Sequence, residues 1–198
     1  SFHSPATRVS MPMTSAACKT KAPAPESNHG YVHVYTGDGK GKTTAALGLA
    51  LRAAGSGLRV AIAAFMKNGA GGEYTMLKQL DKQIRVEDYG SGCFVHGKPA
   101  IGEMNRARQG VRRIERLVGS RQFDLVILDE ANMAVACGLL RVETLLDLIR
   151  CKPAELELVI TGRYAHPEVI AVADLVTEML EVKHYYRKGV LARPGIDM

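Results

Sequence analysis

Residues 35–44 read YTGDGKGKTT and directly follow the short alternating run YVHV at 31–34. A glycine-rich loop that joins a strand to a helix can hold phosphate, because the first N–H groups of a helix have no partner within the helix and the helix dipole is positive there. This stretch therefore restricts the chain to folds in which a strand, a phosphate-binding turn and a helix follow one another.

Strand and helix patterns alternate throughout the chain from residue 31 onward. The expected strands are short, β-branched and apolar on both faces, over 31–35, 60–65, 84–89, 125–128 and 158–160. Helical patterns lie between them, over 45–54, 104–118, 142–149 and 167–175. Such repeats form a parallel sheet with helices on both faces and ligands at the carboxyl ends of the strands. The predicted fold class is α/β, a P-loop NTPase-like parallel sheet in a single domain.

The loop has an expected role for most of its positions. Lys42 brings a positive charge to the phosphates, and the hydroxyl of Thr43 is the expected Mg²⁺ ligand. In the pattern G-x-x-x-x-G-K-[ST] the first glycine would stand at Thr36, so the glycines here are displaced by one. A glycine-rich turn with an incidental G-K-T is the alternative, which the strand before and the helix after disfavour. The expected phosphate-binding residues are Thr36, Gly37, Asp38, Gly39, Lys40, Gly41, Lys42, Thr43 and Thr44.

Two carboxylates stand at the end of the fourth expected strand. Asp129 and Glu130 follow four apolar residues, at a position where P-loop proteins orient Mg²⁺ and its water. If the strand continues, their side chains point to opposite sides, so that one binds the metal and the other orients a neighbour. A solvated turn is the alternative interpretation, and the loop favours the metal site.

Two more segments lie at the expected ligand-binding edge. Phe94, within GSGCFV at 90–95, either contacts a ligand or belongs to the core. Arg163 follows the fifth strand, where a guanidinium reaches a phosphate or another anion; a surface ion pair is the alternative.

Composition bounds the remaining possibilities. The 198 residues are 46% apolar and 23% charged, which suits one buried core, and a net charge of +6 fits an anionic small ligand as well as nucleic acid. Four scattered cysteines indicate neither a disulfide framework nor a zinc site, so a reducing cytoplasm is expected. Residues 1–30 are expected to be a flexible extension that is partly a tag, and a transit peptide, which their composition weakly resembles, is the alternative. No apolar run predicts a membrane span or a signal peptide.

Six motifs together resemble one family, the P-loop class of corrinoid adenosyltransferases. The resemblance runs in order from about residue 31 to the C-terminus, and the displaced glycines occur together with the C-terminal pattern. The motifs are TGDGKGKTT at 36–44, GSGCF at 90–94, LDEAN at 128–132, TGRY at 161–164, EMLEVKH at 178–184 and GVLARPGID at 189–197.

The resemblance implies an enzyme that transfers the 5′-deoxyadenosyl group of ATP to Co(I) of a corrinoid, cob(I)alamin or cob(I)yrinic acid a,c-diamide, and releases triphosphate. Co(I) is a strong nucleophile and needs no general base. The protein must align cobalt with C5′ and neutralise the growing triphosphate charge, with the loop N–H groups and Mg²⁺ contributing. The expected catalytic residues are Lys42, Glu130 and Arg163. The resemblance also implies a homodimer and a reductase that supplies Co(I). It implies no binding to nucleic acid or to a membrane.

The sequence departs from the family pattern at two places. Asp38 stands where family members usually carry Asn, and a carboxylate beside a triphosphate is repelled unless it turns outward or meets the metal. Some members also crowd the lower face of the corrin with an aromatic pair that includes Trp, and this chain has no Trp. Cys93 and Phe94 are therefore the expected corrinoid contacts.

Two other functions fit parts of the sequence. A small-molecule kinase or ATPase would use the same loop and produce ADP. A nucleic-acid-linked ATP-binding module would use a basic helix face, which Glu103 and Glu115 interrupt and few aromatic residues accompany. The residues of that face are Arg106, Arg108, Arg112, Arg113 and Arg116.

Overall fold

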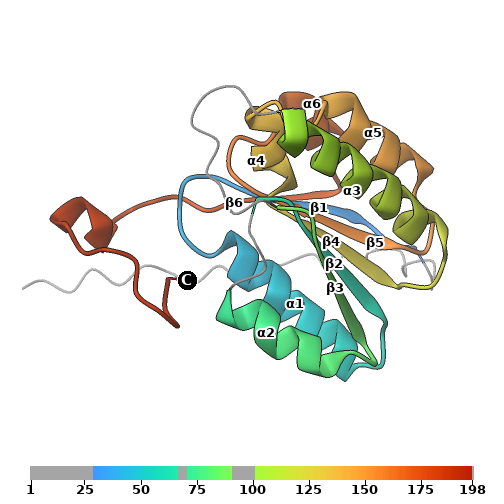
Figure 1. Cartoon of the computed structure of the whole chain (residues 1–198), viewed down its shortest axis with the longest axis horizontal. Helices are drawn as coiled ribbons and strands as arrows, with labels where there is room; N and C mark the ends of the chain where they lie inside the picture. Colours follow the sequence, from blue (N-terminus) through green and yellow to red (C-terminus); the bar gives the residue numbers. More distant parts are fainter. Residues whose placement is uncertain (1–28, 67–70, 91–100, 198) are drawn as a thin grey trace, which may run out of the picture.

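The computed structural model describes residues 29–66, 71–90 and 101–197, and its centre is a six-stranded sheet (Figure 1). Its strand order is β3-β2-β4-β5-β1-β6, and every neighbouring pair is parallel. The parallel α/β sheet predicted from the sequence is thus confirmed. The strands are β1 (Val32–Thr36), β2 (Val60–Ala64), β3 (Ile84–Asp88), β4 (Leu125–Asp129), β5 (Glu157–Thr161) and β6 (Leu175–Glu178).

Helices cover both faces of the sheet. Figure 1 shows α1 and α2 on one face and α3, α5 and α6 on the other. None of the described helices combines the length and the apolar composition that crossing a membrane requires. The helices are α1 (Lys42–Gly55), α2 (Gly72–Leu77), α3 (Ile101–Gly119), α4 (Ala131–Ala136), α5 (Val142–Cys151) and α6 (Pro167–Val172), with 3₁₀ turns η1 (Lys78–Leu80) and η2 (Tyr185–Lys188).

The two faces of the sheet form two separate apolar cores. Along β2, Val60 and Ile62 join the core under α1 and α2, whereas Ala61 and Ala63 join the core on the opposite face. This alternation follows from the two-residue repeat of a strand, in which successive side chains point to opposite faces of the sheet. Because helices cover both faces, every residue of β2 is apolar and buried. The buried strands hold the carboxyl edge of the sheet in place for the loops that follow them.

The five strands expected from the sequence are present, and both ends of each lie within one residue of the expected bounds. The sequence did not predict β6, α2 or α4. The expected helix 167–175 was too long, because α6 ends at Val172 and Leu175 begins β6. All four residues of β6 are exposed, so this edge strand lacks the apolar pattern by which buried strands are found.

A C-terminal arm, defined here as residues 179–197, continues from β6. It carries η2 and projects beyond the carboxyl edge of the sheet (Figure 1). Many of its apolar side chains are exposed, including Leu180 at 70% and Val182 at 87%. Its first residue nevertheless lies against the loop that follows β1, as described next.

Candidate active site

The loop between β1 and α1 has the backbone of a phosphate-binding turn. Gly37 has φ 92° and Gly41 has φ 119°, a region that residues with side chains rarely adopt. Gly41 is also the N-cap of α1, and no described side chain caps that helix. The positive end of the helix dipole therefore faces the interior of the loop, where an anion is stabilised.

The C-terminal arm packs directly against two glycines of this loop, Gly37 and Gly39. The Met179 N–H donates to Thr36 O at 2.9 Å, and its carbonyl accepts from the Gly39 N–H at 2.6 Å. A Cβ at Gly37 would lie 2.4 Å from Met179 O, and one at Gly39 would lie 2.7 Å from Leu180 O. Side chains at either position would collide with the backbone of the arm. Close packing by the arm thus requires glycine at these positions, in addition to any requirement from phosphate.

Lys42 lies in the middle of the loop and is only 7% exposed. Its Nζ donates to Gly37 O at 2.6 Å and to Gly39 O at 2.7 Å. Burial is the largest cause that lowers the pKa of Lys42, and the positive charge of Arg163 is the next; Glu130 and Asp38 act in the opposite direction. A phosphate chain in the loop would supply the negative charge that favours the ammonium form.

Asp129 is the buried centre of a hydrogen-bond network at the end of β4. Its Oδ1 accepts from the Thr43 hydroxyl at 2.9 Å and from the Thr161 hydroxyl at 2.6 Å. Its Oδ2 accepts from the Tyr74 hydroxyl at 2.5 Å. Burial, followed by the charge of Asp129, raises the pKa of Tyr74, so this phenol remains a hydrogen-bond donor. The network brings together Thr43 and Asp129, two residues that the sequence assigned to one metal site.

Glu130 does not continue the strand. β4 ends at Asp129, and Glu130 adopts a left-handed conformation with φ 61° as the N-cap of α4. Its N–H donates to the Thr161 hydroxyl at 3.0 Å. Asp129 and Glu130 therefore do not point to opposite sides of a continuing strand, because the chain turns between them. Asp129 is buried and Glu130 is partly exposed.

The segment after β5 lies close to the loop. Gly162, with φ 128°, packs against the start of α4, where an added Cβ would come within 2.8 Å of Met133 N. Asn132 is buried at that contact, and its Oδ1 has no hydrogen-bond partner among the described residues. Arg163 is exposed, and its charge is near enough to act on Lys42. The Ala165 N–H donates to the Thr36 hydroxyl at 3.3 Å, which joins this segment to the end of β1.

The other predicted site residues lie around the loop or beyond the described residues. Asp38 and Thr44 are exposed. The ammonium of Lys40 contacts the end of the arm at Asp197 rather than the loop interior. Cys93 and Phe94 lie outside the described residues.

Sequence reasoning missed Tyr74, Met179 and the position of Asp197. Met179 and Asp197 were quoted only as parts of C-terminal motifs, which gave no indication that they contact the loop. Tyr74 carried no local signal, since its partner is far away in the chain.

The oxygen atoms at Thr43 and Asp129 suit Mg²⁺, which prefers hard oxygen ligands and takes only one or two of them from protein in nucleotide sites. Among the described residues no group of three or more His, Cys, Asp or Glu side chains could hold a metal ion.

Comparisons with known proteins identify the family of this chain. The family model for ATP:corrinoid adenosyltransferase BtuR/CobO/CobP matches residues 28–198. A corrinoid adenosyltransferase of Pseudomonas aeruginosa is 31% identical over 74% of this chain and 72% of its own length. One from Escherichia coli is 32% identical over 74% of each chain. Among solved structures, the KaiC-like protein PH0186 of Pyrococcus horikoshii aligns with a TM-score of 0.49 and 17% identity over 76% of this chain and 73% of its own. By its match to the family model over nearly all described residues and by these relatives, the chain belongs to the ATP:corrinoid adenosyltransferase family BtuR/CobO/CobP.

Proposed function

We propose that this corrinoid adenosyltransferase binds the triphosphate of ATP in the loop after β1 and transfers the 5′-deoxyadenosyl group to reduced cobalt, with intact triphosphate as the leaving group. The observation that carries the proposal is the contact between Thr43, in the first turn of α1, and Asp129, at the end of β4. It joins the phosphate loop to a buried carboxylate at the carboxyl edge of the sheet, where parallel α/β proteins bind ligands.

The loop and Lys42 would stabilise the leaving group. The bond between C5′ and the triphosphate oxygen breaks as the cobalt–carbon bond forms, and the electron pair leaves with the triphosphate. Lys42 is buried within the loop, where an ammonium acts more strongly on a developing charge than it would in water. Its present acceptors, Gly37 O and Gly39 O, are uncharged, so phosphate oxygens would compete well for it.

Thr43 and Asp129 would hold Mg²⁺, the Thr43 hydroxyl directly and the Asp129 carboxylate directly or through water. The ion would neutralise part of the triphosphate charge when bound. Tyr74 and Thr161 already donate to Asp129, which fixes the orientation of its carboxylate before any ligand binds.

Arg163 and Glu130 are proposed to act at the mouth of the site. Arg163 is exposed and electrostatically coupled to Lys42, so it can approach phosphate oxygens from the solvent side. Glu130 follows Asp129 on a sharp left-handed turn and is partly exposed there, which supports a role in orienting the metal or its water. Neither residue is required as a base, because the reduced cobalt attacks without losing a proton.

The products test this function. The enzyme is mixed with Mg-ATP and chemically reduced cobalamin, and the corrin spectrum and phosphate products are followed together. One triphosphate is expected for each cobalt–carbon bond. Lys42→Ala should lower both products in parallel by roughly thirty- to a thousand-fold, because a charge-assisted contact in a catalytic site contributes about 2–4 kcal/mol.

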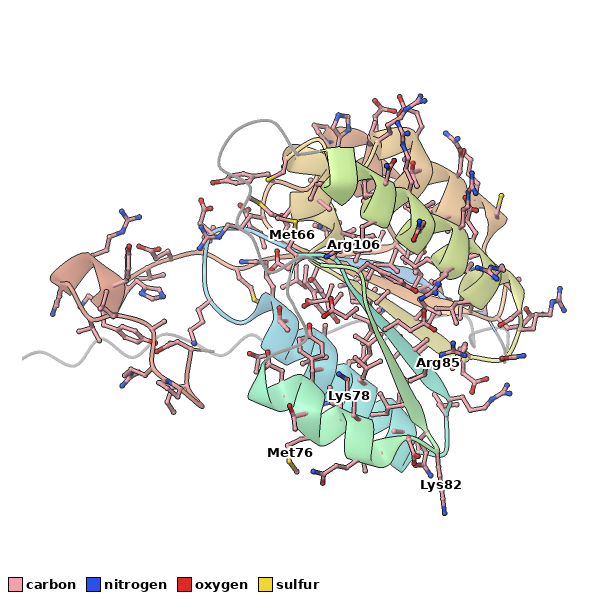
Figure 2. The ribbon with its side chains drawn as sticks, viewed as in Figure 1. Met66, Met76, Lys78, Lys82, Arg85 and Arg106 are labelled. Carbon is pink, nitrogen blue, oxygen red and sulfur yellow. The ribbon has the colours of Figure 1, made fainter. Side chains whose placement is uncertain are left out.

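Lys78→Ala is the matched control. Lys78 is an exposed lysine of η1 on the α2 side of the sheet (Figure 2), and its loss should leave both products unchanged. Accumulation of ADP or orthophosphate in step with turnover, with an unchanged corrin spectrum, would contradict the proposal and favour a kinase or ATPase.

We also propose that the enzyme is a cytoplasmic homodimer that receives electrons from a separate reductase. The family resemblance supports the dimer and the reductase, and the scattered cysteines support a reducing compartment. The exposed apolar side chains of the arm, such as Leu191 at 73%, support association with a second copy. Sedimentation velocity tests the dimer, and a mass of one chain at micromolar concentration would contradict it.

A further inference from the structure

Both ends of the C-terminal arm contact the phosphate loop between β1 and α1. At its start, Met179 exchanges backbone hydrogen bonds with Thr36 and Gly39. At its end, the Lys40 ammonium donates to Ile196 O at 2.7 Å and to Asp197 Oδ1 at 2.6 Å. The arm thus leaves the loop, extends into solvent and returns to the loop.

Asp197 is held firmly by the arm itself. Its Oδ1 accepts from the Tyr185 hydroxyl, and its Oδ2 accepts from the N–H and the Nε of Arg193, both at 3.2 Å. The Arg193 guanidinium lies over the Tyr185 ring, 4.8 Å from its centroid. The Asp197 side chain is 9% exposed, whereas that of Lys40 is 45% exposed. A flexible lysine is therefore fixed by a carboxylate that is already oriented.

These contacts also explain the charge state of the cluster. The hydrogen bond from Lys40, followed by that from Tyr185, holds the pKa of Asp197 well below its usual range. A depressed pKa means that the ion pair is present at neutral pH and is lost only as the pH falls through the folded-state value.

We propose that Asp197 is a positioning residue for ATP binding, which acts by fixing Lys40 and thereby holding the phosphate loop in its binding conformation. This inference rests on the proposed function, since it concerns the same loop. A loop that is ordered before the ligand arrives loses less conformational entropy on binding, and affinity rises accordingly. Lys40 lies between Gly39 and Gly41, so fixing its side chain restricts the part of the loop with the most backbone freedom.

The test uses the full chain and two separate measurements. Calorimetry gives the Kd of Mg-ATP without any corrinoid, and turnover with chemically reduced cobalamin gives kcat and the KM for ATP. In Asp197→Asn we expect both Kd and KM to rise roughly three- to ten-fold with little change in kcat, because one exposed charge-assisted contact is lost. Asp197→Glu should recover most of the affinity. Asp147→Asn is the control, because Asp147 forms an exposed pair with Arg150 at 3.1 Å on α5, far from the loop in sequence.

Variants at Lys40 separate positioning from direct phosphate contact. Lys40→Ala should raise Kd as much as Asp197→Asn does, and the double variant should be no worse than Lys40→Ala alone, because the two residues act through one contact. A parent-like Kd in Asp197→Asn overturns the proposal. A much larger loss in Lys40→Ala than in Asp197→Asn also overturns it, because Lys40 would then bind phosphate itself. A parent that binds ATP but forms no cobalt–carbon bond refutes the proposed function and leaves the Kd comparison intact.

Discussion

Gly37→Ala tests whether the arm, and not phosphate alone, requires glycine in this loop. The new Cβ would lie 2.4 Å from Met179 O, 2.8 Å from Met179 N and 2.9 Å from Glu178 Cγ. Two of these atoms belong to the backbone just after β6 and cannot move without loosening the pairing of β6 with β1. Overpacking of this kind costs about 1–3 kcal/mol. The backbone φ of 92° adds about 1–2 kcal/mol for a residue with a side chain.

The free energy of unfolding should therefore fall by about 2–5 kcal/mol in Gly37→Ala. Urea denaturation without any nucleotide measures it, and a thermal scan should show a Tm lower by roughly 5–15 °C. Gly48→Ala is the matched control: a Cβ there meets nothing within 4 Å in α1, so this change should stabilise the chain by about 0.5–1 kcal/mol. If Gly37→Ala keeps parent stability without ATP and loses only ATP binding, the glycine serves phosphate and our reasoning about the arm is wrong.

Two further predictions concern the site. Tyr74→Phe should lower the free energy of unfolding by about 1.5–3 kcal/mol, because Asp129 loses a buried donor. The folded-state pKa of Tyr74 is raised, so above about pH 10 the phenol ionises only in the unfolded parent chain. The difference in free energy of unfolding between the parent and Tyr74→Phe should therefore shrink as the pH rises above about 10. Urea titrations of both proteins at neutral and alkaline pH measure it, and a pH-independent difference would argue against the ionisation reasoning. Asp38→Asn should leave the Kd of Mg-ATP within a few-fold of the parent, because repulsion from an exposed carboxylate is worth only about 1 kcal/mol; loss of Mg-ATP binding in calorimetry would instead identify Asp38 as part of the metal site.

Local sequence signals predicted the parts of the fold that bury apolar residues on both faces. β2 and β4 are apolar at nearly every position because helices cover both sides of the sheet, and such runs are easily found. β6 escaped prediction for the opposite reason, since an exposed edge strand keeps its position through backbone pairing with β1 and not through apolar side chains. Its first residue, Leu175, therefore appeared to continue the helical pattern of α6.

The same distinction applies to the site. The contact of Thr43 with Asp129 could be anticipated, because a loop after one parallel strand and carboxylates after another must meet at one edge of the sheet. The contact of Tyr74 with Asp129 depends on how α2 packs against the sheet, and that of Lys40 with Asp197 depends on how the arm packs against the loop. No local pattern records such contacts, and they follow only from the complete tertiary structure.

The place of β1 in the sheet has a consequence for synthesis of the chain. Among the described strands, β1 comes first along the chain, but its two neighbours in the sheet, β5 and β6, come last. A nascent chain that has emerged as far as β4 already contains the phosphate loop and Asp129, yet both edges of β1 are still without a partner strand. Contacts between distant segments form slowly, and open strand edges favour association with other chains in the meantime. The phosphate loop is thus synthesised well before the two strands that flank β1 in the folded protein.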